Sequence, residues 1–188
     1  PVTPPVTTAP PPEPTPEPTP ETKPPVTAPT PSPSPEVPKS PEKVMPAHKI
    51  GNLTGPLLSD RWKVTATDLG IPTLLKGGEM LFVFGDTFAG AKVGTPDWRS
   101  PVGLVGKGSV NELVRFTHAA GGDPNYARQF WKYNHDRSPW TNGGFSTVLP
   151  SDVLRVGDRL YLHVMVNQGL GNVLWTEIWY SDDEGASW

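Results

Sequence analysis

Cysteine is absent from this sequence, so disulfide bonds and thiolate metal sites are excluded. No run approaches the roughly 18 apolar residues of a transmembrane helix, and no charged-then-apolar leader opens the chain. The net charge of −3 is too small to favour nucleic acid or a membrane surface as a partner. We therefore expect no transmembrane segment, no nucleic-acid partner and, for an exported protein, a signal upstream of Pro1.

Motifs that hold metals or cofactors are missing as well. The four histidines lack H-x-x-x-H or related spacing, so the sequence predicts no zinc centre; they are His48, His118, His135 and His163. There is no G-x-S-x-G elbow, no P-loop and no G-x-G-x-x-G. We expect neither a metal nor a cofactor.

Proline is unevenly distributed. Of the 26 prolines, 19 lie in residues 1–46, and every Trp, Phe and Tyr lies beyond them. A segment rich in Pro and Thr without large aromatic residues cannot form a core, so 1–46 should be a disordered, extended linker. Residues 47–188 should form the folded domain. The chain begins at Pro1 without a methionine and ends at Trp188 inside an expected hairpin, so we expect it to be a fragment. We also expect a monomer.

The folded region has the pattern of an all-β domain, with short β-branched and aromatic runs between Gly, Pro, Asn and Asp. Gly77-Gly78 separates the runs 71–75 and 80–84, and Gly157-Asp158 divides 153–164, so both pairs of residues should be hairpin turns. Further strands are expected at 102–105, 113–117 and 173–180.

The last eight residues, Ser181–Trp188, fit the S-x-D-x-G-x-x-W pattern of the Asp box in sialidase-like propellers. Asp183 should tie this turn through hydrogen bonds, Gly185 should supply a permissive φ, and Trp188 should pack beneath. We therefore assign the acidic residues 182–184 to structure. Hairpins plus such a turn indicate a partial β-propeller of two to three blades, since a blade takes roughly 40–50 residues.

Two carboxylates lie at the open ends of the first hairpin. A turn centred between Gly77 and Gly78 makes Asp68 and Asp86 neighbours, and a bulge at Gly70 or Gly85 would bring both onto one face. Opposed side chains on one face have Cβ atoms about 5 Å apart, which suits paired carboxylate chemistry. The alternative is that one aspartate caps a turn and the other ends a strand.

Three segments carry a family resemblance: Asp68–Pro72, Leu81–Phe88 and Trp98–Ser100. Together they resemble domain of unknown function 4185, a family associated with glycoside hydrolase family 183, endo-acting D-arabinanases of actinobacterial cell-wall arabinan. The resemblance runs from about Ser59 to Trp188. It implies a five-bladed propeller of which this chain holds only the N-terminal part, inactive and unstable alone.

The resemblance also implies a secreted or cell-envelope enzyme that cleaves D-arabinofuranosyl linkages in arabinogalactan or lipoarabinomannan. Asp68 would be the base or nucleophile, and Asp86 the partner acid or the charge that raises its partner's pKa, an assignment that stays open. Reserve acids are Asp152 and Glu177. The candidate substrate-binding residues are Trp98, Arg99, Trp131 and Trp140, with Tyr133 as a further stacking surface.

Two other functions remain open. A non-catalytic carbohydrate-binding or adhesion propeller would keep the aromatic residues and need no carboxylate pair. A sialidase-like hydrolase would need an arginine cluster to grip a substrate carboxylate, and the sequence does not group Arg61, Arg99 and Arg115.

Overall fold

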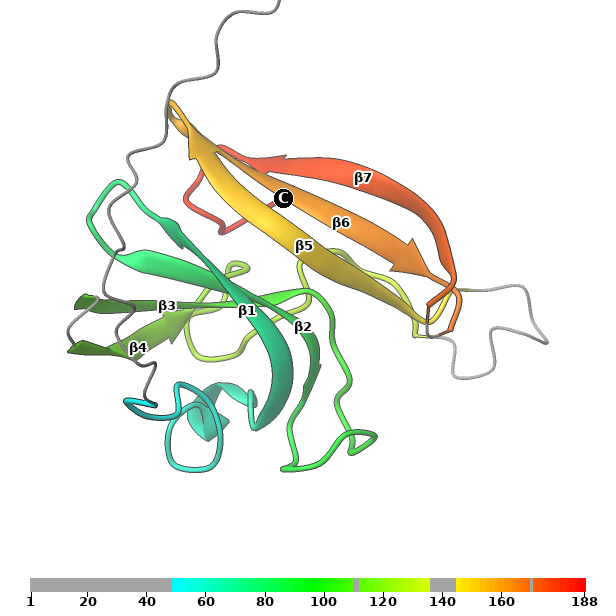
Figure 1. Ribbon diagram of the computed structural model, residues 1–188, viewed down its shortest axis with the longest axis horizontal. Coiled ribbons are helices and arrows are strands. Elements are labelled where there is room, and N and C mark those ends of the chain that lie inside the picture. Colours follow the sequence, from blue (N-terminus) through cyan, green and yellow to red (C-terminus); the bar gives the residue numbers. More distant parts are fainter. Residues whose placement is uncertain (1–48, 110–111, 136–144, 170) are drawn as a thin grey trace, which may run out of the picture. The chain divides into compact units, whose positions relative to one another are not determined.

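The computed structural model describes residues 49–109, 112–135, 145–169 and 171–188. The predicted linker over 1–46 lies outside these residues. One short 3₁₀ helix and seven strands are present (Figure 1). They are η1 (Asp60–Trp62), β1 (Ala66–Leu74), β2 (Met80–Phe88), β3 (Val102–Ser109), β4 (Glu112–Ala119), β5 (Thr147–Val156), β6 (Arg159–Asn167) and β7 (Val173–Ser181). No α-helix occurs in the described ranges, so the all-β prediction is confirmed.

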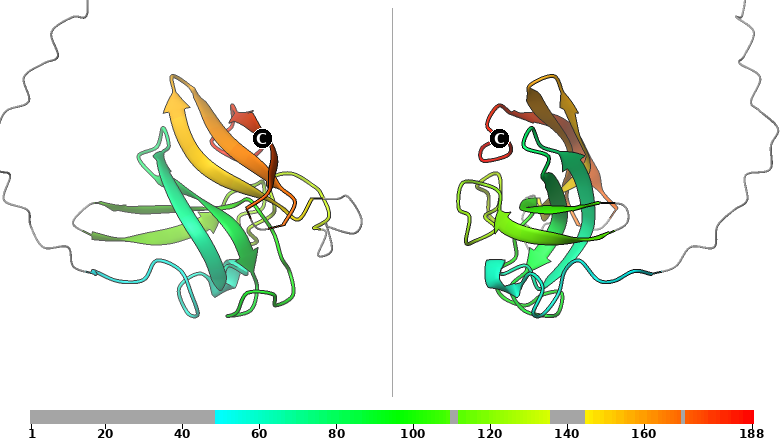
Figure 2. Two further views of the ribbon diagram at one scale, coloured as in Figure 1. Left: turned by 45° about the vertical axis from the view of Figure 1, so that its right-hand side comes forward. Right: turned by 90° about the vertical axis from the view of Figure 1, so that its left-hand side faces the viewer.

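The strands form two antiparallel sheets in which sequence neighbours pair. The first sheet has the order β1-β2-β3-β4, and the second has the order β5-β6-β7. β5 runs alongside β1 and β2 and so joins the two sheets (Figure 1, Figure 2). Consecutive antiparallel strands need only short turns, which is why local turn signals determine so much of this topology.

The first hairpin turn is where predicted, but its register is shifted by one residue. Leu75 N–H donates to Glu79 O at 2.8 Å, and Gly78 N–H donates to Leu75 O at 3.1 Å. The loop therefore contains three residues, with Gly78 in the left-handed region at φ 76°. The turn is centred on Gly77, and the prediction of a centre between Gly77 and Gly78 is wrong.

The second hairpin turn is confirmed. Val156 pairs with Arg159 across the two-residue loop Gly157-Asp158, and Gly157 has φ 58°. A positive φ at the first loop position is typical of the turns that match strand twist, and glycine adopts it without a Cβ penalty.

β2 supplies both faces of the core. Leu81 and Val83 belong to a cluster shared by the two sheets, whereas Phe82 and Phe84 belong to a second cluster around Trp62. Alternate side chains of a strand point to opposite faces, so burial on both faces explains why this strand is a continuous apolar run. The second sheet adds six residues to the shared cluster: Val148, Val153, Leu160, Leu162, Val164 and Val166.

The turn after β7 has the geometry of an Asp box. Asp183 Oδ1 accepts from Ser187 N at 2.9 Å and from Ser181 Oγ at 2.7 Å. Gly185 has φ 89° and donates its N–H to Ser181 Oγ at 2.8 Å. Trp188 packs on the core with its ring stacked on Phe130. The structural role predicted for this turn is confirmed.

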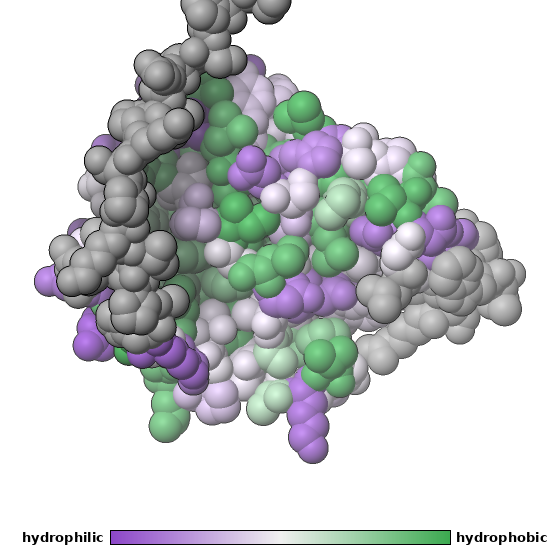
Figure 3. All heavy atoms as spheres, viewed as in Figure 1, coloured by the Kyte–Doolittle hydropathy of each residue, from purple (hydrophilic) through white to green (hydrophobic). Residues whose placement is uncertain are grey.

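β7 is an edge of its sheet in the part of the chain described, because it pairs only with β6. Its large apolar side chains Trp175, Ile178 and Tyr180 are exposed. Figure 3 shows apolar and polar side chains interspersed over the second sheet. Within the described residues, no helix has the length and apolarity needed to cross a membrane.

Candidate functional site

A bulge in β1 brings Asp68 and Asp86 together. The register of β1 against β2 shifts on both sides of Leu69, where Leu69 and Gly70 have φ values of 62° and 94°. A bulge changes which face a side chain occupies. As a result, Asp68 and Asp86 line one open pocket of about 270 Å³.

Gly85 makes room for the Asp68 carboxylate. A Cβ built on Gly85 would overlap Asp68 Oδ1 and would touch Leu69 Cδ1 at 3.0 Å. Gly85 is itself buried in β2. Gly85 is therefore needed, because without a Cβ it lets the Asp68 carboxylate lie close to β2, the strand that carries Asp86.

The environment of Asp68 favours its protonated form. Partial burial raises the pKa of the Asp68 carboxyl, and the charge of Asp86 raises it further. Hydrogen bonds from the backbone N–H groups of Asp86 and of Asp68 itself oppose this shift without cancelling it. Two close carboxylates resist ionising together, so one member of the pair retains its proton to a higher pH.

Asp86 is held from two sides. Trp98 Nε1 donates to Asp86 Oδ1 at 2.8 Å, and Thr147 Oγ1 donates to the same oxygen. Trp98 comes from the loop between β2 and β3, while Thr147 begins β5. The carboxylate thus lies where the two sheets meet, and hydrogen bonds to its charged form stabilise it.

Trp98 lies in a stack of rings. Phe88 is 6.0 Å from it between ring centroids, and His135 is 4.1 Å from it with 27° between the ring planes. His135 in turn contacts Tyr133, at 4.7 Å. Trp98 was predicted to bind substrate; the structure places it against Asp86, and its binding role stays a prediction.

Arg99 is buried and bonded to backbone carbonyls. Only 5% of it is exposed. Its Nη1 donates to Ala127 O and its Nη2 to Lys63 O. The guanidinium therefore fastens the loop beneath Trp98 to its neighbours, and the substrate-binding role stays a prediction. These contacts also leave Arg99 out of any arginine cluster of the sialidase kind.

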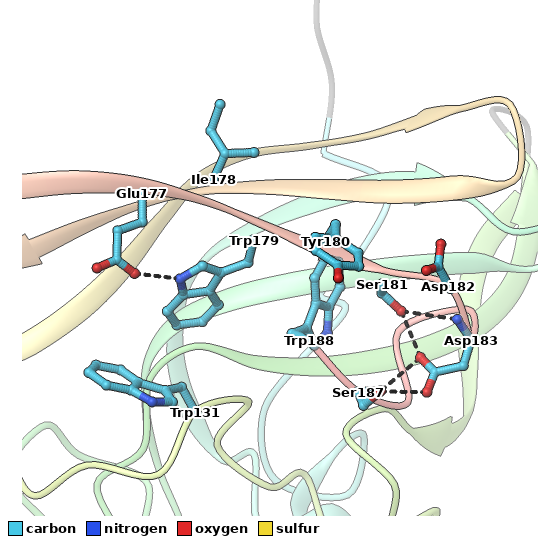
Figure 4. Close-up of a pocket in the computed structure, with 10 residues that line it drawn as sticks. All are labelled: Trp131, Glu177, Ile178, Trp179, Tyr180, Ser181, Asp182, Asp183, Ser187 and Trp188. Atoms are coloured by element: carbon cyan, nitrogen blue, oxygen red, sulfur yellow. Dashed lines mark hydrogen bonds between the residues drawn. The ribbon is translucent and has the colours of Figure 1, made fainter.

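Trp131 lines a different and larger pocket, of about 720 Å³, along β7. Figure 4 shows Trp131 facing Trp179, with Ile178 pointing away on the other side of the strand. Glu177 accepts from the indoles of Trp175 and Trp179 at 2.8 and 2.7 Å. Aromatic side chains line this pocket together with acidic and hydroxyl side chains, and it does not include the carboxylate pair.

The two reserve acids have structural partners. The pKa of Glu177 is lowered by the hydrogen bonds from Trp179 and Trp175, which makes its carboxyl a poor proton donor. Asp152 Oδ1 accepts from Val153 N–H at 2.8 Å beside the β5 bulge. Trp140 lies outside the described residues. Among the described residues, no group of three or more His, Asp or Glu side chains is arranged to hold a metal ion.

Sequence reasoning missed three contributors to this site. Thr147 was assigned no role, Gln129 was not singled out, and His135 was set aside because its spacing fits no metal motif. Thr147 contacts Asp86 directly, whereas His135 contacts Trp98 and Gln129 contacts His135. The polar aromatic stretch 125–135 was the one available signal.

Two curated fungal proteins are similar to this chain. Notoamide biosynthesis cluster protein J of Aspergillus sp. (strain MF297-2) is 41% identical over 117 residues, which cover 56% of this chain and 31% of that protein. Notoamide biosynthesis cluster protein J' of Aspergillus versicolor is 38% identical over 96 residues, with 49% and 26% covered. The matched region spans under a third of either relative.

A family match covers most of the folded region. Domain of unknown function DUF4185 matches residues 54–188. The match includes both aspartates, the loop that carries Trp98 and the Asp-box turn. The chain therefore belongs to the family described as domain of unknown function DUF4185.

Proposed function

We propose that the protein is a glycoside hydrolase in which Asp68 and Asp86 form the catalytic pair. The observation that carries the proposal is their shared pocket, in which burial and the charge of Asp86 raise the pKa of Asp68. Glycosidases generally use two carboxyl groups, one protonated and one ionised, on either side of the scissile bond. The environments of the two aspartates differ, because the pKa of Asp68 is raised whereas Asp86 accepts hydrogen bonds from Trp98 and Thr147.

The proposal gives different tasks to the two groups. Asp68 is the proton donor to the leaving oxygen, because burial and the charge of Asp86 raise its pKa. Asp86 is the anionic partner, as a base or a nucleophile, because Trp98 and Thr147 both donate to it. The sequence alone left this assignment open, with Asp68 as the candidate base or nucleophile and Asp86 as its partner acid or the charge that raises its partner's pKa. The oxocarbenium-like transition state would be stabilised by the negative charge of Asp86.

The substrate proposal rests on the family resemblance. We propose an endo-acting enzyme for D-arabinofuranosyl linkages of cell-wall arabinan, secreted or attached to the cell envelope. The first sheet would be one blade of a five-bladed propeller, and β5–β7 with the Asp-box turn would be the inner part of the next. The pocket between β1 and β2 would then face the centre of the ring, where propellers commonly bind ligands.

The test is cleavage of purified cell-wall arabinogalactan by the full-length protein and by its Asp68→Asn and Asp86→Asn variants. Asparagine keeps the shape but cannot transfer a proton at neutral pH or act as an anionic nucleophile. Product release should fall by about 10²–10⁴ in each variant. Circular dichroism and thermal unfolding verify that the variants are folded.

Asp60→Asn is the matched control, because Asp60 is an exposed aspartate in η1 and lines neither pocket. It should cleave at the wild-type rate. Full activity in both pocket variants would remove this pair from the mechanism.

A second candidate is a carbohydrate-binding propeller without catalytic activity. The observation that favours it is Trp131, which is 42% exposed in the pocket along β7. An aromatic face of this kind can stack on the apolar face of a sugar ring. Arabinan binding by a folded wild type that releases no product, lost in Trp131→Ala but not in Asp68→Asn, would favour this candidate over the enzyme.

A further inference from the structure

The orientation of the Gln129 side chain is determined by three contacts with the backbone. Its Nε2 donates to Trp131 O at 2.8 Å and to Tyr133 O at 3.2 Å. Its Oε1 accepts from Ser100 N–H at 3.0 Å. Exchanging the amide oxygen and nitrogen would place oxygen against two carbonyls and nitrogen against an N–H, so the assignment has no workable alternative.

This orientation sets the protonation of His135. His135 Nε2 lies 2.7 Å from Gln129 Oε1, and His135 Nδ1 lies 2.8 Å from Ser146 O. Both partners are carbonyl oxygens, which only accept hydrogen bonds. Each ring nitrogen must therefore carry a hydrogen, and that requires the imidazolium form.

The charged ring lies directly against Trp98. The 4.1 Å centroid distance and 27° angle make this a face-to-face contact, in which an aromatic face attracts a cation. The same indole donates its N–H to Asp86. A cation over the indole withdraws electron density and strengthens the N–H as a donor.

We propose that His135 is a positioning residue for Asp86: it is held as an imidazolium by Gln129 and Ser146, and it acts on the carboxylate through Trp98. The catalytic meaning of this arrangement rests on the proposed function. The protonation state and its link to Trp98 do not, since the first follows from the hydrogen bonds of His135 and the second from its ring contact with Trp98.

The ionisable neighbours of His135 in the described part of the chain are consistent with a cation there. Tyr133 packs against the ring at 4.7 Å and stays neutral, because burial raises its pKa. Asp86, on the other side of Trp98, supplies the complementary negative charge. Arg99 follows Trp98 in the loop, but its guanidinium is bonded to Ala127 and Lys63.

The direct test is ¹⁵N NMR of the histidine rings in the full-length protein. At pH 7.5, both nitrogens of His135 should give protonated shifts, whereas an ordinary histidine, with a pKa near about 6.5, is roughly 90% neutral there. A single neutral tautomer of His135 at this pH would overturn the proposal. No variant is needed for this measurement, so a folding defect cannot obscure it.

The link to Trp98 is tested through its indole N–H resonance, identified because Trp98→Phe removes it. As pH rises, this resonance should move with the same midpoint as the His135 ring nitrogens. In Gln129→Met, which removes the acceptor for Nε2, both midpoints should fall together by about one pH unit or less, as expected for one hydrogen bond. Lys132→Met, an exposed change in the same segment, should leave both unchanged. An indole resonance that ignores the titration of His135 would refute the positioning role.

Activity gives an independent readout. His135→Phe keeps a stacking ring without its charge, so the cleavage rate should fall about two- to fivefold, the usual size of a cation–aromatic attraction. In the wild type, the rate should decline at alkaline pH as His135 loses its proton, and this decline should be absent in His135→Phe. An unchanged pH profile in a folded His135→Phe would contradict the proposal. If instead Asp68→Asn and Asp86→Asn cleave at the wild-type rate, the proposed function fails while the NMR result for His135 stands.

Discussion

The hairpins β1–β2 and β5–β6 are built alike but use one ladder position differently. In both, the first strand has a bulge several residues before the turn, near Gly70 in one and at Ser151 in the other. We count along the second strand of each hairpin from the residue that closes its turn. On this count, Asp86 occupies the place in the first hairpin that Val166 occupies in the second, and Asp68, its neighbour across the ladder, occupies the place of Val148. These valines pair with each other and are fully buried.

The difference separates a structural use of this position from a functional one. Fully burying a valine side chain contributes about 1.5 kcal/mol or more to stability, whereas a carboxylate there must be hydrogen-bonded and partly hydrated. In the first hairpin, Trp98 and Thr147 meet that need for Asp86. A position that gives up hydrophobic burial for a pair of like charges is where function is expected.

The largest expected effect comes from giving the second hairpin the charge of the first. Val166→Asp buries a carboxylate without partners, so the free energy of unfolding should fall by about 4 kcal/mol or more, a large part of the roughly 5–15 kcal/mol of a typical domain. Urea denaturation of the full-length protein measures it. The reciprocal variant, Asp86→Val, should remain folded. A similar fall in the free energy of unfolding in both variants would mean that the two positions are equivalent.

The next effect concerns the space beside Asp68. Gly85→Ala should displace the Asp68 carboxylate, because the new Cβ overlaps Oδ1. A misplacement of roughly 1 Å can lower a rate about 10²-fold, which an arabinan cleavage assay would detect. Gly77→Ala is the control, since no atom lies within 4 Å of a Cβ built there. Wild-type activity in Gly85→Ala would show that the position of Asp68 is not critical.

A smaller effect compares the Asp-box turn with a plain glycine turn. Burial opposes ionisation of Asp183, but hydrogen bonds from Ser187 and Ser181 outweigh it and lower its pKa. Asp183→Ala should therefore reduce stability at pH 7 by about 1 kcal/mol, since solvent screens the bonds of this exposed carboxylate. Because the folded-state pKa is lowered, this contribution is present above the ordinary value near about 4 and is lost as pH falls through the folded-state pKa.

Asp182→Ala is the matched control for this turn. Asp182 is exposed and bonded only to Arg159 among the hydrogen bonds of the described residues, so its loss should reduce stability by less than the loss of Asp183 does. Thermal unfolding at pH 7 and pH 3 checks both variants. Equal losses at pH 7 would mean that the bonds inside the turn contribute no more than a surface ion pair.

The smallest effect is a gain. The pKa of Asp68 is raised, first by burial and then by Asp86, so its stabilising contribution is complete below the ordinary pKa and is lost as pH rises through the folded-state value. Asp68→Asn should therefore be more stable than wild type at pH 7, by less than about 1 kcal/mol because Asp68 is only partly buried and solvent reaches much of its surface. The gap should close below about pH 4. A less stable Asp68→Asn at pH 7 would contradict the assigned environment.

Local signals in the sequence determined most of the described secondary structure. The Gly77-Gly78 and Gly157-Asp158 turns, the strands on either side and the Asp-box turn were all predicted from turn residues between apolar runs. They could be predicted because turn conformation depends on the φ preferences and side-chain hydrogen bonds of a few adjacent residues. The nearness of Asp68 and Asp86 followed from the same hairpin.

Only the tertiary structure decided how the pair is oriented and held. The register depends on whether the loop has two or three residues, and a shift of one residue exchanges the faces of a strand. The contacts from Thr147 and Trp98 to Asp86, and from Gln129 to His135, join segments that no turn rule connects. Sequence specifies such contacts only through the packing of whole sheets, and this packing gives Asp68 and Asp86 their different environments.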